Sequence, residues 1–169
     1  MNARALVPTA AALVALGVMV SNGAVASAAP KAAEVTLVMY SETVGFFNVD
    51  SNAPGIDHGD LFHRELSLSR TPGGPVVGVA YSQAEVISHS PENDVDVRRV
   101  TVEDRLPKGQ LFMMGVTELK RGTTPAPGWT DTYAVIGGTG KYAGARGTQS
   151  LLLLPDGKTF KVTWRLTIL

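Results

Sequence analysis

The sequence predicts an all-β fold, an eight-stranded antiparallel β-barrel preceded by an N-terminal leader. From Glu34 onward, apolar and polar residues alternate over short runs, and no run of a dozen residues has the spacing of an amphipathic helix. Glycine and proline, 18 and 10 of the 169 residues, bound many of these runs. An open sheet of eight strands would leave exposed edges, which closure into a barrel removes.

The first part of the chain is typical of an export signal. Within residues 1–28, Arg4 is the single charged side chain, and an apolar run of about sixteen residues follows it. That run is shorter than the ~20 residues that a spanning helix needs, so a stop-transfer anchor is the weaker alternative. Small residues fit signal peptidase cleavage after Ala26 or Ala28, and we favour Ala28. We therefore expect a signal peptide over 1–28, a barrel domain over 29–169, a secreted, extracellular protein and no membrane contact after processing.

Composition excludes several classes of function. The 15 basic residues balance the 15 acidic ones, so the chain lacks the positive charge of a nucleic-acid-binding protein. There is no cysteine, which excludes a disulfide framework, a thiolate nucleophile and a cysteine zinc site. We expect no nucleic acid partner and no cofactor.

The predicted strands follow one another with short reversals. In order, they are Val35–Ser41, Leu61–Arg70, Val76–Ser88, Val95–Arg105, Gln110–Leu119, Thr132–Ile136, Ala145–Leu154 and Thr159–Ile168. Tight turns are expected at 71–75, 106–109 and 154–157, because each combines a proline with a glycine that tolerates positive φ. The longer segments 43–59 and 120–131 are rich in Pro, Gly and Asn and are predicted to be surface loops.

Alternation indicates which side chains face the interior. On the last strand, Trp164 belongs to an apolar face opposite Lys161 and Arg165, and on the first strand Met39 and Ser41 lie opposite Glu42. An eight-stranded barrel is just wide enough to be filled by side chains or to hold one small ligand. Met39, Ser41 and Trp164 are therefore candidate lumen residues.

One glycine-rich segment resembles a known signature. Residues 133–147, Tyr-Ala-Val-Ile-Gly-Gly-Thr-Gly-Lys-Tyr-Ala-Gly-Ala-Arg-Gly, are similar to the signature of the allene oxide cyclase and dirigent barrel superfamily. Shorter matches follow the family order at 58–61, 77–79 and 109–115. The resemblance implies an eight-stranded antiparallel barrel whose lumen receives an apolar small molecule, with Arg64 and Ser82 facing that lumen. It also implies a homodimer or homotrimer, since family members often assemble in this way.

The sequence departs from the family at the expected catalytic positions. Plant allene oxide cyclases carry a glutamate on the first strand, and Ser41 takes that place here. Glu42 is one residue further along and would point outward unless a bulge shifts the register. The position of the cyclase cysteine aligns approximately with Ala84. Ser41 and Glu42 are therefore two catalytic candidates. The third is Glu85, on the third predicted strand.

Glu85 is the one acid in the middle of an apolar strand. Facing inward, it would have a raised pKa suited to proton transfer, but we favour an outward position beside a basic residue. A separate basic cluster, Arg98, Arg99, Arg105 and Lys108, alternates with Asp94, Asp96, Glu103 and Asp104, and this mixed charge is interpreted as a solvated strand face with cross-strand pairs.

Three further patterns have simpler interpretations than a site. Gly138 to Ala143 spells a dinucleotide fingerprint, but no helix is expected after it, so its glycines are interpreted as a sharp corner. Asp57, His58, Asp60 and His63 have no established metal-ligand spacing, and we expect no metal. Trp129 is interpreted as a loop aromatic packed on the barrel rim, with a ligand lid as the alternative.

Three hypotheses for function remain open. The first is a secreted barrel that binds an apolar or aromatic metabolite and steers its cyclisation or coupling, which predicts a cavity of a few hundred Å³. The second is a carrier that uses the same cavity without turnover. The third is a filled barrel whose outer face, including Tyr40, Val79 and Tyr81, builds an extracellular oligomer.

Overall fold

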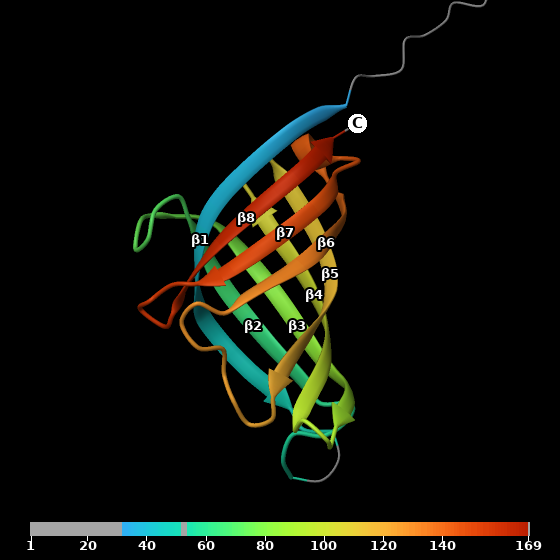
Figure 1. The fold of residues 1–169 in the computed structure, drawn as a ribbon. Coiled ribbons are helices and arrows are strands. Elements are labelled where there is room, and N and C mark those ends of the chain that lie inside the picture. Colours follow the sequence, from blue (N-terminus) through green and yellow to red (C-terminus); the bar gives the residue numbers. More distant parts are fainter. Residues whose placement is uncertain (1–31, 52–53, 169) are drawn as a thin grey trace, which may run out of the picture.

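A computed structural model describes residues 32–51 and 54–168 as a closed barrel of antiparallel strands in sequence order (Figure 1). Each strand pairs with the next, and the last pairs with the first. The strands are β1 (Ala33–Val49), β2 (Leu61–Ser69), β3 (Val76–Ser90), β4 (Val95–Leu106), β5 (Gly109–Lys120), β6 (Thr130–Gly138), β7 (Arg146–Leu153) and β8 (Thr159–Ile168). The predicted fold class is confirmed. The signal peptide expected over 1–28, with cleavage after Ala26 or Ala28, lies outside the described residues.

The first strand is longer than the sequence predicts. The expected loop over 43–59 is wrong in its first part, because β1 continues to Val49 and pairs with β2 along its whole second half. The register shifts between Thr43 and Gly45, so the bulge comes after Glu42. Glu42 therefore keeps the outward position that simple alternation gives it.

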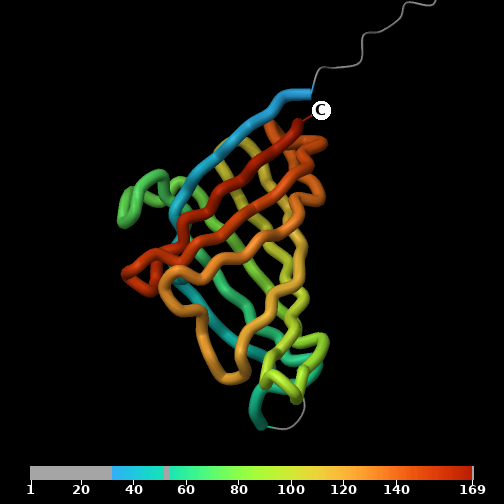
Figure 2. Tube along the Cα trace, in the orientation of Figure 1, coloured from blue at the N-terminus to red at the C-terminus, as the bar shows by residue number. Residues whose placement is uncertain are grey.

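One end of the barrel is packed with side chains. Trp164 and Leu111 are fully buried there, together with Leu166, Met113 and Val135. These residues lie on the inward faces of their strands, as the alternating pattern predicts. This end is where β1 begins and β8 ends, at the top of Figure 1. At the opposite end of the tube in Figure 2, the 121–129 connection starts next to the segment that leads into β2, because Arg121 pairs with Asp57.

The glycine-rich signature forms a corner, not a helix that could bind pyrophosphate. A single 3-10 turn, Gly140–Tyr142, joins β6 to β7. At Gly109, whose φ is 144°, a Cβ atom would lie 2.0 Å from the Thr139 carbonyl oxygen. Glycine is required at this contact because the β4–β5 and β6–β7 connections touch backbone to backbone. No helix in the described part of the chain has the length and hydropathy needed to cross a lipid bilayer.

Candidate functional site

The half of the lumen away from the packed end contains a cavity. Its walls come mainly from the inward faces of β2, β3 and β4, and Pro125 and Trp129 from the 121–129 connection cover one side. The space that water-sized molecules can enter measures about 90 Å³. This is smaller than the predicted few hundred Å³, because long side chains such as Arg64, Arg98 and Tyr133 extend into the lumen.

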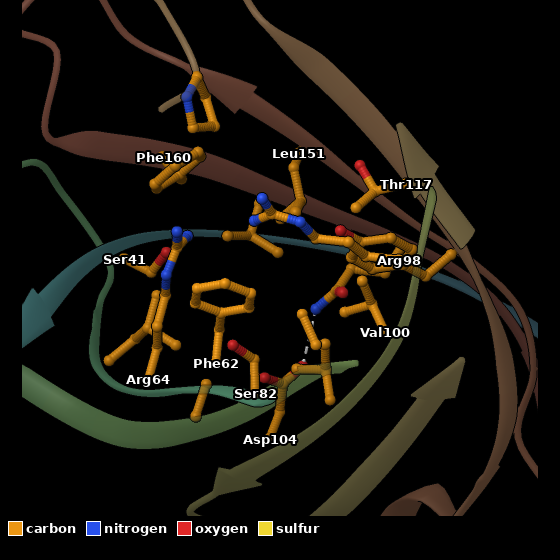
Figure 3. A pocket seen from close by; sticks show the side chains of 18 of the residues that line it. Ser41, Phe62, Arg64, Ser82, Arg98, Val100, Asp104, Thr117, Leu151 and Phe160 are labelled. Atoms are coloured by element: carbon orange, nitrogen blue, oxygen red, sulfur yellow. Dashed lines mark hydrogen bonds between the residues drawn. The ribbon is translucent and has the colours of Figure 1, made fainter. Parts of the chain in front are cut away.

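The cavity wall is mostly apolar, with a few polar groups set into it (Figure 3). Such a combination is typical of small-molecule sites, where apolar surface supplies affinity and polar groups set orientation. The apolar part is formed by Phe62, Leu66, Val100, Val102, Leu151 and Phe160. Trp129 meets Phe160 edge to face at 6.3 Å, so this loop aromatic lines the cavity as well as packing on the rim.

Asp104 is the acid inside the cavity. Its side chain is on the inward face of β4 and the residue is 1% exposed. Trp164 Nε1 donates a hydrogen bond to Oδ2 at 3.0 Å, and Gln149 Nε2 donates to the same oxygen at 2.9 Å. Burial raises the pKa of Asp104 to about 7, against a smaller opposing effect of the Trp164 hydrogen bond. A pKa near neutrality suits a general acid or base.

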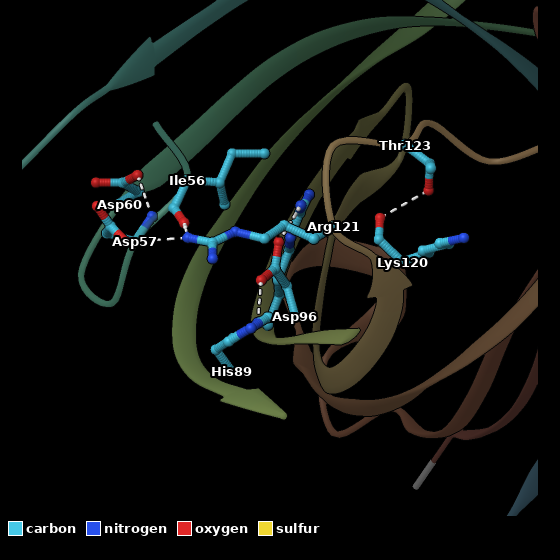
Figure 4. Close-up of polar contacts among 9 residues, drawn as sticks. Ile56, Asp57, Asp60, His89, Asp96, Lys120, Arg121 and Thr123 are labelled. Carbon is cyan, nitrogen blue, oxygen red and sulfur yellow. Dashed lines mark hydrogen bonds and ion pairs between the residues drawn. The ribbon is translucent and has the colours of Figure 1, made fainter. Parts of the chain in front are cut away.

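Arg98 is held by a buried carboxylate behind it. Its Nη2 lies 3.2 Å from Asp96 Oδ2, and His89 Nδ1 lies 3.2 Å from the other oxygen of that carboxylate (Figure 4). The Arg98 guanidinium also lies 4.5 Å from the centre of the Phe62 ring. Asp96 and Arg98 are both buried, and their pairing offsets the free-energy cost of removing each charge from water.

Arg64 and Tyr133 are further polar groups on the wall. Burial and the nearby charge of Arg98 lower the pKa of Arg64, which also lies 5.9 Å from the Phe46 ring centre. Burial, and then the Asp131 carboxylate, raise the pKa of Tyr133. The Tyr133 phenol therefore stays protonated throughout the physiological pH range.

The structure separates the residues that the sequence proposed for the site. Ser41, Arg64 and Ser82 line the cavity, whereas Met39 and Trp164 face inward but belong to the packed core. Met39 and Trp164 therefore belong to the packed end that closes the lumen. Trp164 also reaches Asp104 through its indole N–H.

The two acidic candidates lie outside. Glu42 is on the outer face of β1 and accepts a hydrogen bond from Thr159 Oγ1 at 3.2 Å. Glu85 is paired with Arg99, as we favoured, on the outer face of β3. Neither carboxylate can reach a molecule in the lumen.

The interpretation of the charged residues as a solvated strand face is wrong for three of the six on β4. Arg99 and Glu103 do face outward, but Asp96, Arg98 and Asp104 face the lumen and are buried. A signal for this was present in the sequence. These three alternate in step with Val100, Val102 and Leu106, and the opposite face from 99 to 105 is entirely polar.

The residues considered for a metal site have other contacts. Asp57 pairs with Arg121 at 3.0 Å (Figure 4), and Asp60 accepts the backbone N–H groups of Ser51 and Asp57. His63 stacks on Phe47 on the outer face of the barrel. Among the described residues, no group of three or more His, Cys, Asp or Glu side chains could hold a metal ion.

Comparison with known proteins places this geometry in a structural class. No family model and no curated protein sequence matches the chain. Solved structures do match. A pyocyanin demethylase superposes with a TM-score of 0.62 at 23% identity, covering 78% of this chain and 99% of that one. A pterocarpan synthase dirigent protein superposes with a TM-score of 0.60 at 16% identity, covering 84% and 96%.

This chain has the dirigent-like barrel fold. The resemblance to the allene oxide cyclase and dirigent superfamily that the glycine signature suggested is thus confirmed at the level of fold. The same fold occurs in the Diels-Alderase AbmU from Streptomyces koyangensis, with a TM-score of 0.60 at 13% identity, covering 80% of this chain and 69% of that one. In this dirigent-like barrel the cavity is lined by Ser41 on β1 and by the buried acid Asp104 on β4.

Proposed function

We propose that the protein binds an apolar or aromatic small molecule in the lumen and steers its cyclisation or coupling, with Asp104 as the proton-transferring group. The observation that carries this proposal is a carboxyl group buried in an apolar cavity, with a pKa of about 7. The structural neighbours support it, since their names describe a demethylase, Diels-Alderases and a dirigent protein.

The cavity and Asp104 would contribute separately to the reaction. Apolar walls exclude water and restrict a flexible substrate to the conformer in which its reacting atoms meet. The protonated Asp104 carboxyl donates its proton to a substrate oxygen that gains negative charge, and the carboxylate takes a proton back from the product-forming intermediate. General acid–base catalysis of this kind contributes roughly 10²- to 10⁴-fold to a rate.

The test compares wild type with Asp104→Asn and with the outward-facing control Glu103→Gln. Each protein is incubated with a small-molecule extract of the secreting host, and the retained and released compounds are identified by mass spectrometry. We expect wild type and the control to retain a compound and change it, and Asp104→Asn to retain it while changing it at least ~100-fold more slowly. A conversion that is equally fast in Asp104→Asn would refute the role of Asp104.

A carrier without turnover is the second candidate. It is favoured by Ser41, because the buried first-strand position that faces the cavity carries a hydroxyl group in place of an acid. In the same experiment a carrier would retain a compound and release it chemically unchanged, in wild type and in Asp104→Asn alike. That outcome would favour the carrier over the enzyme.

We also propose that the protein is exported and that its leader is removed after Ala28. The support is the apolar segment with small residues at its end. N-terminal sequencing of the protein recovered from the culture medium tests this. A first residue of Ala29 is expected, and protein found only inside cells with an intact leader would contradict export.

A further inference from the structure

The charged side chains that line the cavity include more positive than negative groups. Two guanidinium groups, of Arg64 and Arg98, face the lumen, and the acid that lines it is Asp104. Asp96 compensates Arg98 from behind. Within residues 32–51 and 54–168, no carboxylate forms an ion pair with Arg64. The Arg64 charge therefore lacks a local counter-charge, in a partly buried position where water compensates it poorly.

A second observation concerns the donor groups of Arg98. The residue is 5% exposed, and its Nη2 is occupied by Asp96. Its buried Nε–H has no hydrogen-bond acceptor in the described part of the protein. Buried donors without acceptors are rare in folded proteins and call for an explanation. An anionic group bound in the lumen would supply the missing counter-charge for Arg64, and the Arg98 guanidinium on the same wall would add a second positive charge beside it.

We infer that the ligand is a small organic acid with an apolar or aromatic body, an inference that rests on the proposed binding function. Its anionic group, such as a carboxylate, would bind to Arg64, with Arg98 beside it. The body would lie against Phe62 and the valines of β4. The hydrogen bonds from Trp164 and Gln149 both end on Oδ2 of Asp104, so Oδ1 remains available for another part of the same molecule. Arginine is well suited to this role, because its planar group binds carboxylates through two parallel hydrogen bonds.

The test uses trans-cinnamate and its neutral amide, cinnamamide, as probes of nearly equal shape. Their dissociation constants are measured by isothermal titration calorimetry at pH 6, where the carboxylate is ionised, for wild type, Arg64→Gln, Arg64→Lys and Arg165→Gln. Arg165 lies on the exposed outer face of β8, so its variant is a matched control for the loss of one positive charge. Arg98 is left intact because removing it would leave Asp96 buried without its partner.

We expect wild type to bind cinnamate roughly tenfold to hundredfold more tightly than cinnamamide, the range for hydrogen bonds to a charged group. Arg64→Gln should abolish most of that preference while leaving cinnamamide affinity within about twofold, Arg64→Lys should keep part of it, and Arg165→Gln should keep all of it. Arg64→Gln should melt at the wild-type temperature or above, since it removes an uncompensated charge.

Three results would overturn the inference. Equal affinities for the acid and the amide in wild type, or an unchanged preference in Arg64→Gln, would refute the anion site while leaving the binding function intact. If neither probe binds wild type, the inference fails together with the proposed binding function.

Discussion

Asp104 and Glu103 are adjacent acids in the sequence, and their environments differ completely in the fold. Glu103 faces solvent beside Arg105 at 3.0 Å, whereas Asp104 points into the lumen between Trp164 and Gln149. The sequence could have indicated this difference, because Asp104 alternates in step with the valines of β4. Its hydrogen bonds could not be predicted, since Gln149 and Trp164 come from other strands, 45 and 60 residues away in the chain.

The buried Asp104 should make the stability of the protein depend on pH. Its pKa in the folded protein is about 7, above the ordinary value of 3.8 that applies to the unfolded chain. Between these values the folded state holds a proton that the unfolded state has released, so the unfolding free energy falls as pH rises from about 4 to about 7. The contribution is roughly 1.4 kcal/mol for each pH unit.

The substitution Asp104→Asn should remove this pH dependence of the unfolding free energy, because the amide is neutral at every pH. The amide oxygen can still accept the Trp164 hydrogen bond. Urea unfolding at pH 5 and pH 8 measures the unfolding free energy of both proteins. The same substitution is not expected to destabilise the protein at pH 8, and Glu103→Gln should keep the wild-type pH dependence. A wild type and an Asp104→Asn variant that respond identically to pH would show that Asp104 titrates normally.

Asp60 is an acid whose pKa is shifted in the opposite direction. Oδ1 accepts the Ser51 N–H at 2.9 Å and Oδ2 accepts the Asp57 N–H at 2.8 Å, and these hydrogen bonds lower the pKa of Asp60. Asp60→Asn leaves one of the two N–H groups without an acceptor and should lower the unfolding free energy by about 1–3 kcal/mol at pH 7.

Because the pKa of Asp60 is lowered on folding, its contribution is present above the unfolded pKa and is lost as pH falls through the folded pKa. Urea unfolding curves of wild type and Asp60→Asn should therefore converge in acid. Asp57→Asn is the control, because the exposed Asp57–Arg121 pair should contribute less than about 1 kcal/mol. Equal losses in both variants would refute a special role for Asp60.

At the scale of elements, the strands with regular alternation were the ones that could be predicted. The bounds of β8 follow from its five apolar residues at every second position. The second half of β1 could not be found in this way, because the bulge at Val44 interrupts the alternation and its neighbours are Gly45, Phe46 and Phe47. Pairing with β2 makes this segment a strand, and pairing is not visible in one segment alone.

Alternation on β3 provides a matched pair of substitutions for the lumen. Ala84 lines the cavity, while its neighbour Gln83 is exposed on the outer face. Ala84→Trp should fill the space beside Phe62 and weaken cinnamate binding at least ~10-fold, because the cavity has little free volume to lose. Gln83→Trp should bind as wild type does.

Calorimetric titration of both variants measures this, and their thermal unfolding shows whether each remains folded. Ala84→Trp that folds and binds with wild-type affinity would place the binding site outside the lumen.

For the whole molecule, closure of the barrel followed from the need to pair strand edges, and the structure confirms it. How the lumen is divided could not be predicted, because composition gives the residues that face inward but not how far each extends. One half is closed by Trp164 and its neighbours, and the other half keeps a cavity narrowed by Arg64 and Arg98. Assembly as a homodimer or homotrimer stays a prediction, which the mass in solution would test.

The most direct test of the account locates a bound molecule by NMR in protein with labelled valine methyl groups and indole N–H groups. Val100 and Val102 line the cavity with Trp129, whereas Val79 and Val116 lie on the outward-facing side of β3 and β5. On addition of cinnamate, we predict shifts of the Val100 and Val102 methyl signals and of the Trp129 indole signal. Shifts confined to Val79 and Val116, or no shifts at saturating cinnamate, would contradict the lumen as the site.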